Sequence, residues 1–123
     1  MVEEKFKLGK ELLLILDQQD EKPTACFWFY LAENDFLRLV IAYKGSGVSS
    51  TSDAYRKFIG KFGNNDIVKE IGLYNIMILM DNDGFINLLR TAITTGPDSI
   101  SGIRFSSNVI NGVMIDDAYI YRL

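Results

Sequence analysis

The sequence predicts one domain of the α/β or α+β class, in which a mixed five-stranded sheet is combined with three helices in the order α-β-β-α-β-α-β-β. Apolar segments of strand length carry β-branched and aromatic residues. Stretches with apolar side chains at helical spacing lie between them. The length of 123 residues fits a single domain that buries roughly two-thirds of its unfolded surface. Residues 1–123 are therefore expected to form one globular unit.

The first part of the chain predicts a helix followed by a hairpin. Apolar side chains recur near one face of a helix from residue 3 to about residue 19. Pro23 breaks this pattern, and residues 24–31 then form an apolar and aromatic run that suits a central strand covered on both faces. A polar turn at residues 33–35 leads to a second run at residues 36–43, so the two strands are expected to pair.

A second helix is predicted after a loop rich in glycine and serine. Ser50, with Asp53 three residues later, resembles a helix-start box, although Thr51 or Ser52 can equally provide the cap. An apolar stripe follows at helical spacing, and the polar segment 63–65 ends the helix. The stripe consists of Tyr55, Phe58, Ile59 and Phe62.

A third helix is predicted after the next strand. Residues 66–73 are ambiguous and compatible with a short helical turn, and residues 74–80 predict a buried strand. Asp81 and Asp83 can cap the helix, which is expected to end at Gly96-Pro97. Its stripe consists of Phe85, Leu88, Leu89, Ala92 and Ile93. The two inner connections of the sheet are thus helical crossovers, right-handed where they join parallel strands.

The chain ends in a predicted hairpin whose register follows from one dipeptide. Asn111-Gly112 suits a type I′ turn, which needs positive φ at both central residues. Ile110 then pairs with Val113, and Arg104 pairs with Tyr119. One face carries a mostly apolar set that is expected to lie in the core: Ile103, Phe105, Val109, Met114, Ala118 and Ile120, with Ser107 and Asp116 as polar interruptions.

The second face of the hairpin is the candidate binding or dimer interface. It carries Arg104, Ser106, Asn108, Ile115, Asp117, Tyr119 and Tyr121. Arg104 and Asp117 are diagonal neighbours within reach of an ion pair. Tyr and Arg are enriched in interface hot spots, although such a face also fits an ordinary solvent-exposed sheet. A bulge at Asp116-Asp117 would exchange the two tyrosines for Ile120.

The composition excludes several classes of function. The net charge is −3 and no run of Lys or Arg is present, which disfavours duplex nucleic acid and membranes but leaves a local basic patch open. The absence of histidine excludes Ser-His and Cys-His nucleophile pairs and histidine-containing zinc sites. The apolar run at residues 12–16 is too short for a signal peptide or a membrane span. We therefore expect a cytoplasmic protein in which the single cysteine, Cys26, packs in the core.

Two loops carry residues that are compatible with ligand binding. The loop at residues 44–52 leads into a helix N-terminus and is a candidate anion site, although its residue order is not that of a Walker motif. Asp81 and Asp83 offer oxygen ligands for Mg²⁺ or Ca²⁺, and they equally suit turn and cap chemistry. If the preceding strands are parallel, both loops lie on one rim of the sheet. The anion candidates are Lys44, Gly45, Ser46 and Gly47.

Several segments resemble those of a family of small prokaryotic proteins. The similar segments are Gly96-Pro97, SGIRFS at residues 101–106, NVINGV at 108–113 and DAYIYRL at 117–123. The apolar runs at residues 27–31 and 37–42 are also similar to the first hairpin of these proteins. The resemblance implies a prokaryotic source but does not imply any activity.

Together the observations favour a small non-enzymatic binding or regulatory module without a cofactor. It is expected to form a homodimer or another homo-oligomer, or to bind another protein, through the second hairpin face or an exposed strand edge. One alternative is a Mg²⁺-dependent enzyme that handles phosphate or nucleotide groups with Lys44, Asp81 and Asp83. Another is a toxin or immunity-type protein, which is suggested only by the small size and the acidic balance.

Overall fold

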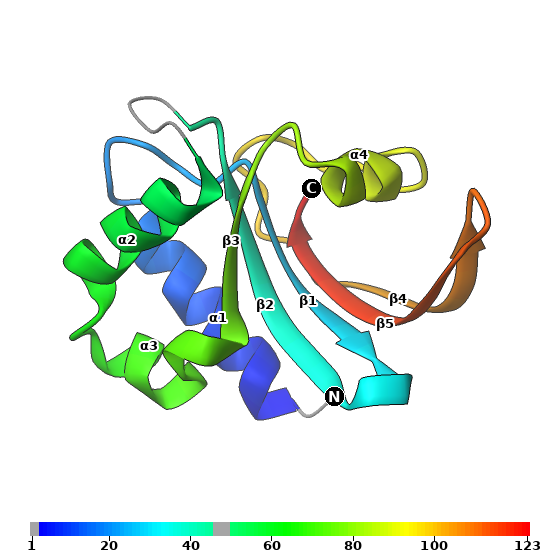
Figure 1. The fold of residues 1–123 in the computed structure, drawn as a ribbon, viewed down its shortest axis with the longest axis horizontal. Helices are drawn as coiled ribbons and strands as arrows, with labels where there is room; N and C mark the ends of the chain where they lie inside the picture. The colour runs from blue at the N-terminus through cyan, green and yellow to red at the C-terminus, as the bar shows by residue number, and fades with distance from the viewer. Residues whose placement is uncertain (1–2, 46–49) are drawn as a thin grey trace.

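A computed structural model describes residues 3–45 and 50–123 (Figure 1). These residues form one mixed sheet with the strand order β3-β2-β1-β5-β4, which confirms the α/β class. The strands are β1 (Ala25–Leu31), β2 (Phe36–Tyr43), β3 (Ile76–Met80), β4 (Ile103–Ile110) and β5 (Val113–Arg122). The helices are α1 (Glu3–Leu16), α2 (Thr51–Phe62), α3 (Asp66–Ile71) and α4 (Gly84–Arg90), with 3-10 turns η1 (Ala32–Asn34) and η2 (Leu73–Asn75).

The pairing of the strands follows the predicted connections. β1 and β2 form the expected antiparallel hairpin, and β2 pairs in parallel with β3 through the helical crossover of α2 and α3. β5 inserts between β1 and β4 and is antiparallel to both. The connection that contains α4 links the two edge strands of the sheet, β3 and β4. Among the described residues, no helix has the length and apolarity needed to cross a membrane.

Local capping residues begin the helices where the sequence predicts them. The Ser50 hydroxyl accepts a hydrogen bond from the Asp53 amide at the start of α2, and the Asp83 carboxylate accepts one from the Phe85 amide at the start of α4. The ambiguous segment after α2 forms α3 and then η2. α4 ends at Arg90, earlier than predicted, because the residues that follow, Thr91, Ile93, Thr94 and Thr95, are β-branched and have low helix propensity.

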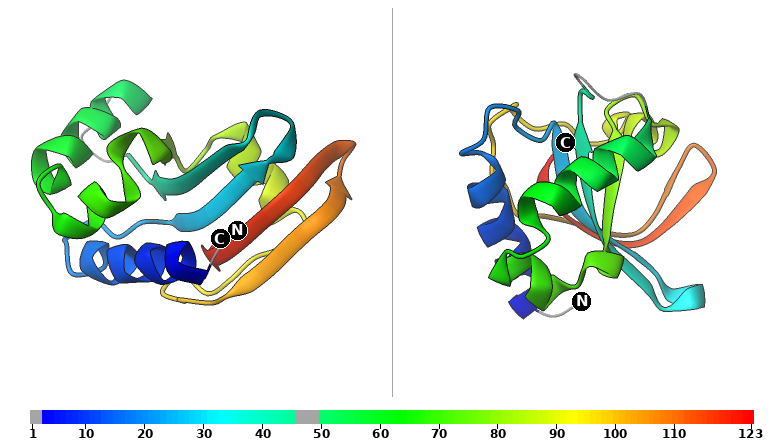
Figure 2. Two further views of the ribbon diagram at one scale, coloured as in Figure 1. Left: turned by 90° about the horizontal axis from the view of Figure 1, so that it is seen from below. Right: turned by 60° about the vertical axis from the view of Figure 1, so that its left-hand side comes forward.

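The sheet separates two apolar clusters. α1, α2 and α3 cover one face and α4 covers the other, an arrangement visible in both views of Figure 2. Trp28 and Phe27 are adjacent in β1 and lie in different clusters. Cys26 is fully buried, which confirms its place in the core, and burial raises the pKa of its thiol to about 12.

Helix α1 approaches β1 and β5 closely through Gly9. The Trp28 Nε1 donates to the Lys5 carbonyl at 3.0 Å and to the Tyr121 hydroxyl at 3.1 Å, and that hydroxyl in turn donates to the Phe6 carbonyl. A Cβ at Gly9 would lie 2.7 Å from the Trp28 Nε1 and also overlap the Tyr121 hydroxyl. The gap between α1 and the strands β1 and β5 is therefore too narrow at this position for any residue but glycine.

The last residue of β5, Arg122, is a buried arginine that links this strand to the segments before β1 and β4. Arg122 is fully buried and forms a bidentate ion pair with Asp17, with distances of 2.8 and 2.7 Å. Its remaining donors reach the carbonyls of Ser99 and Pro23. The hydrogen bonds to Asp17 raise the pKa of the guanidinium, because they favour its charged form.

Candidate functional site

The C-terminal hairpin has the register that its turn predicts. Asn111 and Gly112 adopt φ values of 47° and 82°, as a type I′ turn requires. Ile110 pairs with Val113, and Arg104 pairs with Tyr119. The same register also places Ser106 opposite Asp117.

The faces of the hairpin exchange halfway along it. Ser107 has a positive φ of 51° and is absent from the ladder of paired residues, as is Asp116, its expected partner. On the turn side of this irregularity, Ile110 and Ile115 join the apolar cluster beneath α4. The irregularity occurs in both strands at matching positions, so the register is the same on either side of it.

This exchange corrects three predictions. Val109 and Met114 were expected in the core, but their exposed fractions are 63% and 52%. Ile115 was expected on the second face, but it is fully buried. The predicted alternation fails because one residue out of step in each strand moves every following side chain to the opposite face.

The irregularity at Ser107 and Asp116 is contacted by a hydrogen bond from outside the hairpin. The Asp116 Oδ2 accepts a hydrogen bond from the Ala32 amide at 3.0 Å, at the start of η1. Asp116 is therefore engaged with the end of the first hairpin, although it is absent from the ladder with β4. The contact fixes where the outer half of the hairpin begins.

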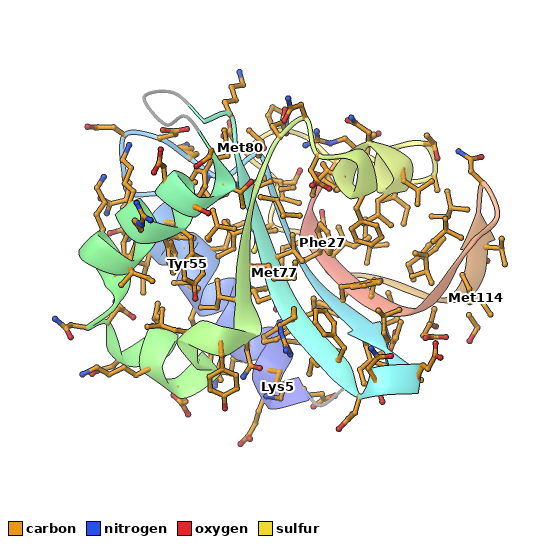
Figure 3. The ribbon with its side chains drawn as sticks, in the orientation of Figure 1. Lys5, Phe27, Tyr55, Met77, Met80 and Met114 are labelled. Carbon is orange, nitrogen blue, oxygen red and sulfur yellow. The ribbon has the colours of Figure 1, made fainter. Side chains whose placement is uncertain are left out.

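The outer half presents apolar side chains to solvent. Val113 is 43% exposed, and with Val109 and Met114 it forms a set that we call the hairpin tip. Figure 3 shows Met114 at the far end of the hairpin, away from α1, α2 and α3. These three residues are half of the exposed large apolar side chains of the described chain, the others being Leu14, Ile59 and Tyr74. Val109 and Met114 are paired across the ladder and form one exposed patch, whereas Val113 pairs with Ile110 and lies on the other face.

Strand β4 forms one edge of the sheet next to the hairpin tip. Its predicted interface residues Arg104, Ser106 and Asn108 are exposed. The Arg104 guanidinium binds the Asp117 carboxylate through contacts of 2.6 and 2.5 Å, which confirms the predicted diagonal ion pair. The Asn108 side chain donates to the Ser106 carbonyl at 2.9 Å. Because its one charge is paired, the β4 edge carries little net charge.

The two predicted interface tyrosines are not on an open surface. Tyr121 is 1% exposed, so its assignment to an exposed binding face is wrong. Tyr119 is half-buried, with its ring stacked on Phe6 at a centroid distance of 3.9 Å. The prediction failed because α1 covers the inner half of the second face, a contact between segments more than one hundred residues apart.

The described residues that directly follow β2 and β3, Lys44 and Asp81, lie on one rim of the sheet, as parallel pairing of these strands requires. The Asp81 amide donates to the Tyr43 carbonyl at 2.8 Å. The Asp81 carboxylate accepts from the Thr24 hydroxyl at 2.6 Å and from Arg90 at 2.8 Å. Burial alone would raise the pKa of this carboxyl, but these hydrogen bonds and the charges of Arg90 and Lys44 lower it below its usual value.

This geometry does not support the metal alternative. The Asp83 carboxylate caps α4, and the Asp81 carboxylate is engaged by a cation and a hydroxyl. Within residues 3–45 and 50–123, no group of three or more metal-ligating side chains occurs. In the candidate anion loop, Lys44 is exposed and the Gly45 amide donates to the Glu21 carboxylate at 3.3 Å, while Ser46 and Gly47 lie outside the described residues.

The observed architecture defines a small α/β domain with an open β4 edge and an apolar hairpin tip. No protein family, curated protein or solved structure matches the chain. The resemblance to small prokaryotic proteins therefore stays a prediction.

Proposed function

We propose that this protein is a binding module that self-associates by pairing β4 with β4 of a second copy and packing the two hairpin tips together. The observation that carries this proposal is the exposed cross-strand pair of Val109, in the edge strand β4, and Met114, in its neighbour β5. An exposed edge supplies unpaired backbone donors and acceptors, and the tip supplies apolar area.

The β4 edge lacks two of the usual protections against pairing, Lys and Pro. β4 has eight residues with neither Lys nor Pro, and its single charge, Arg104, is neutralised by Asp117. The other edge, β3, has only five residues. The positive φ at Ser107 divides β4 into two short stretches, so the apolar tip must contribute to any stable pairing.

A second copy is the partner that these features favour. Antiparallel pairing of β4 with itself is two-fold symmetric, so it closes as a dimer and leaves no further β4 edge. Because the edge is nearly neutral, two identical edges do not repel each other, although the chain carries a net charge of −3.

The test is the concentration dependence of the oligomeric state in sedimentation equilibrium. The double variant Val109→Lys/Met114→Lys should weaken dimerisation by at least about tenfold, because it places like charges on both sides of the two-fold axis. The matched control is Leu14→Lys/Ile59→Lys, which changes two exposed apolar residues on α1 and α2 and should leave the dimer unchanged.

Two results would overturn the proposal. One is a wild-type chain that remains monomeric at every concentration. The other is equal weakening by the hairpin-tip variant and by its control, which would assign the association to a surface other than the tip.

A further inference from the structure

We infer a second site, separate from the β4 edge, in the hollow between α1 and the segment before β4: it binds a small organic phosphate monoester. The hollow measures about 320 Å³, at the lower end of the range of roughly 300–1,000 Å³ that is typical of small-molecule sites. Its lining residues are Phe6, Lys7, Lys10, Ile100, Ser101, Gly102, Tyr119 and Tyr121.

The charge of the hollow is opposite to that of the whole chain. Lys7 and Lys10 lie one turn apart on α1, so their side chains are neighbours on the helix surface. Among the ion pairs of the described chain, none includes either lysine, and no carboxylate lines the hollow. Lys5 differs, because its ammonium group lies over the Trp28 ring at 5.8 Å. Two cations are therefore available at one wall of the hollow.

The opposite wall supplies hydroxyl donors in fixed positions. Tyr119 stacks on Phe6 and meets Tyr121 edge-on at 5.4 Å, so its ring is held from two sides. Across the described residues, the Tyr119 hydroxyl forms no hydrogen bond, whereas the Tyr121 hydroxyl is engaged with Trp28 and Phe6. The Ser101 amide donates to the Tyr121 carbonyl at 2.7 Å, which fixes the backbone that carries the Ser101 hydroxyl.

Gly102 keeps the Tyr119 hydroxyl in its position. A Cβ at this residue would lie 2.5 Å from the Tyr119 Oη and 3.3 Å from its Cζ. Gly102 does not adopt a positive φ, so space and not backbone conformation is the reason for glycine. Any side chain here would displace the phenol that faces the hollow.

These groups select the class of ligand. Ammonium groups bind phosphate as point charges, and a phosphate monoester carries close to two negative charges at neutral pH. Free hydroxyls can donate to its oxygens, while Phe6 and Ile100 offer apolar surface to an organic substituent. The combination favours an organic phosphate over inorganic phosphate.

The experiment titrates the full chain with phenyl phosphate, inorganic phosphate and benzyl alcohol, followed by calorimetry and by amide chemical shifts at residues 100–102 and 119. Phenyl phosphate should bind more tightly than either of the other probes. Lys7→Gln/Lys10→Gln and Tyr119→Phe should each weaken binding by roughly tenfold or more, because each removes hydrogen bonds to a charged group. Gly102→Ala should weaken it as well.

The matched control is Lys57→Gln/Lys61→Gln, which removes two exposed lysines from α2. It should leave binding unchanged, and so should the hairpin-tip variant Val109→Lys/Met114→Lys, which separates this site from self-association. Equal weakening by both lysine pairs would indicate diffuse electrostatic attraction and overturn the inference. Equal affinity for inorganic phosphate and phenyl phosphate would overturn the ligand class. The Lys and Tyr119→Phe variants decide the outcome if Gly102→Ala fails to fold.

Discussion

The inner and outer halves of the C-terminal hairpin belong to the same two strands and share one register, yet their surroundings differ. In the inner half, Tyr121 and Ile120 are both buried, one beneath α1 and the other on the side of α4. In the outer half, Ile115 is buried while its sequence neighbour Met114 is exposed. The comparison shows that strand pairing can be local and predictable while burial depends on which other element covers each face.

The largest expected effect concerns the inner half. Tyr121→Ala should destabilise the protein by about 3–5 kcal/mol, because it removes a buried aromatic ring and leaves the Trp28 Nε1 with one partner fewer. Urea unfolding measures the change. The control is Tyr74→Ala, at a tyrosine that is 79% exposed. Similar losses of stability in the two variants would contradict the conclusion that burial beneath α1 makes Tyr121 important for folding.

A smaller effect is expected where α1 touches the inner half. In Gly9→Ala, overpacking against Trp28 and Tyr121 costs about 1–3 kcal/mol, and the better helix propensity of alanine returns about 1 kcal/mol. Net destabilisation is therefore expected in thermal unfolding. Gly60→Ala in α2 is the control, because a Cβ there meets nothing within 4 Å and the variant should be more stable than the wild type. A stabilising Gly9→Ala would show that the α1 contact is loose.

The pH dependence sharpens the same contrast. Burial raises the pKa of the Tyr121 phenol above its usual value of about 10. Because the folded-state pKa is the higher one, this contribution to stability is complete below about pH 10 and is lost as pH rises from there towards the folded pKa. Urea midpoints measured from pH 8 to pH 11 should fall less steeply in Tyr121→Phe than in the wild type. Identical slopes would show that Tyr121 does not couple folding to pH.

The smallest effect on stability is expected at the hairpin tip. Val109→Thr/Met114→Gln should change the free energy of unfolding by less than about 0.5 kcal/mol per site, because both side chains are mostly exposed. The measurement is made at protein concentrations too low for dimerisation. A loss of several kcal/mol in the free energy of unfolding would show that the tip is packed against the same chain.

Local signals in the sequence account for most of the fold. Asn111-Gly112 sets the hairpin register, and Ser50 and Asp83 begin helices, because each acts on backbone groups a few residues away. Helix α4 ends early for an equally local reason, the low helix propensity of the β-branched residues that follow Arg90.

The candidate site was predicted only in part. The Arg104 and Asp117 pair follows from the register, but the burial of Tyr121 depends on α1, and the exchange of faces at Ser107 depends on a positive φ that serine rarely adopts. The ion pair of Arg122 with Asp17 joins residues 105 positions apart and has no local signal. The sequence does not single out Lys7 and Lys10 as site residues, because only the fold brings them to the same hollow as Tyr119 and Tyr121.

The position of β5 between β1 and β4 has a consequence for folding kinetics. The hydrogen bond between Trp28 and Tyr121 closes a loop of 93 residues, and the whole β1–β5 ladder has similar sequence separation. The two halves of the sheet can form their hairpins early, but they join only when these distant strands meet. We therefore expect the zipping of β5 onto β1 to limit the folding rate, with both central strands acting as temporary edges until then.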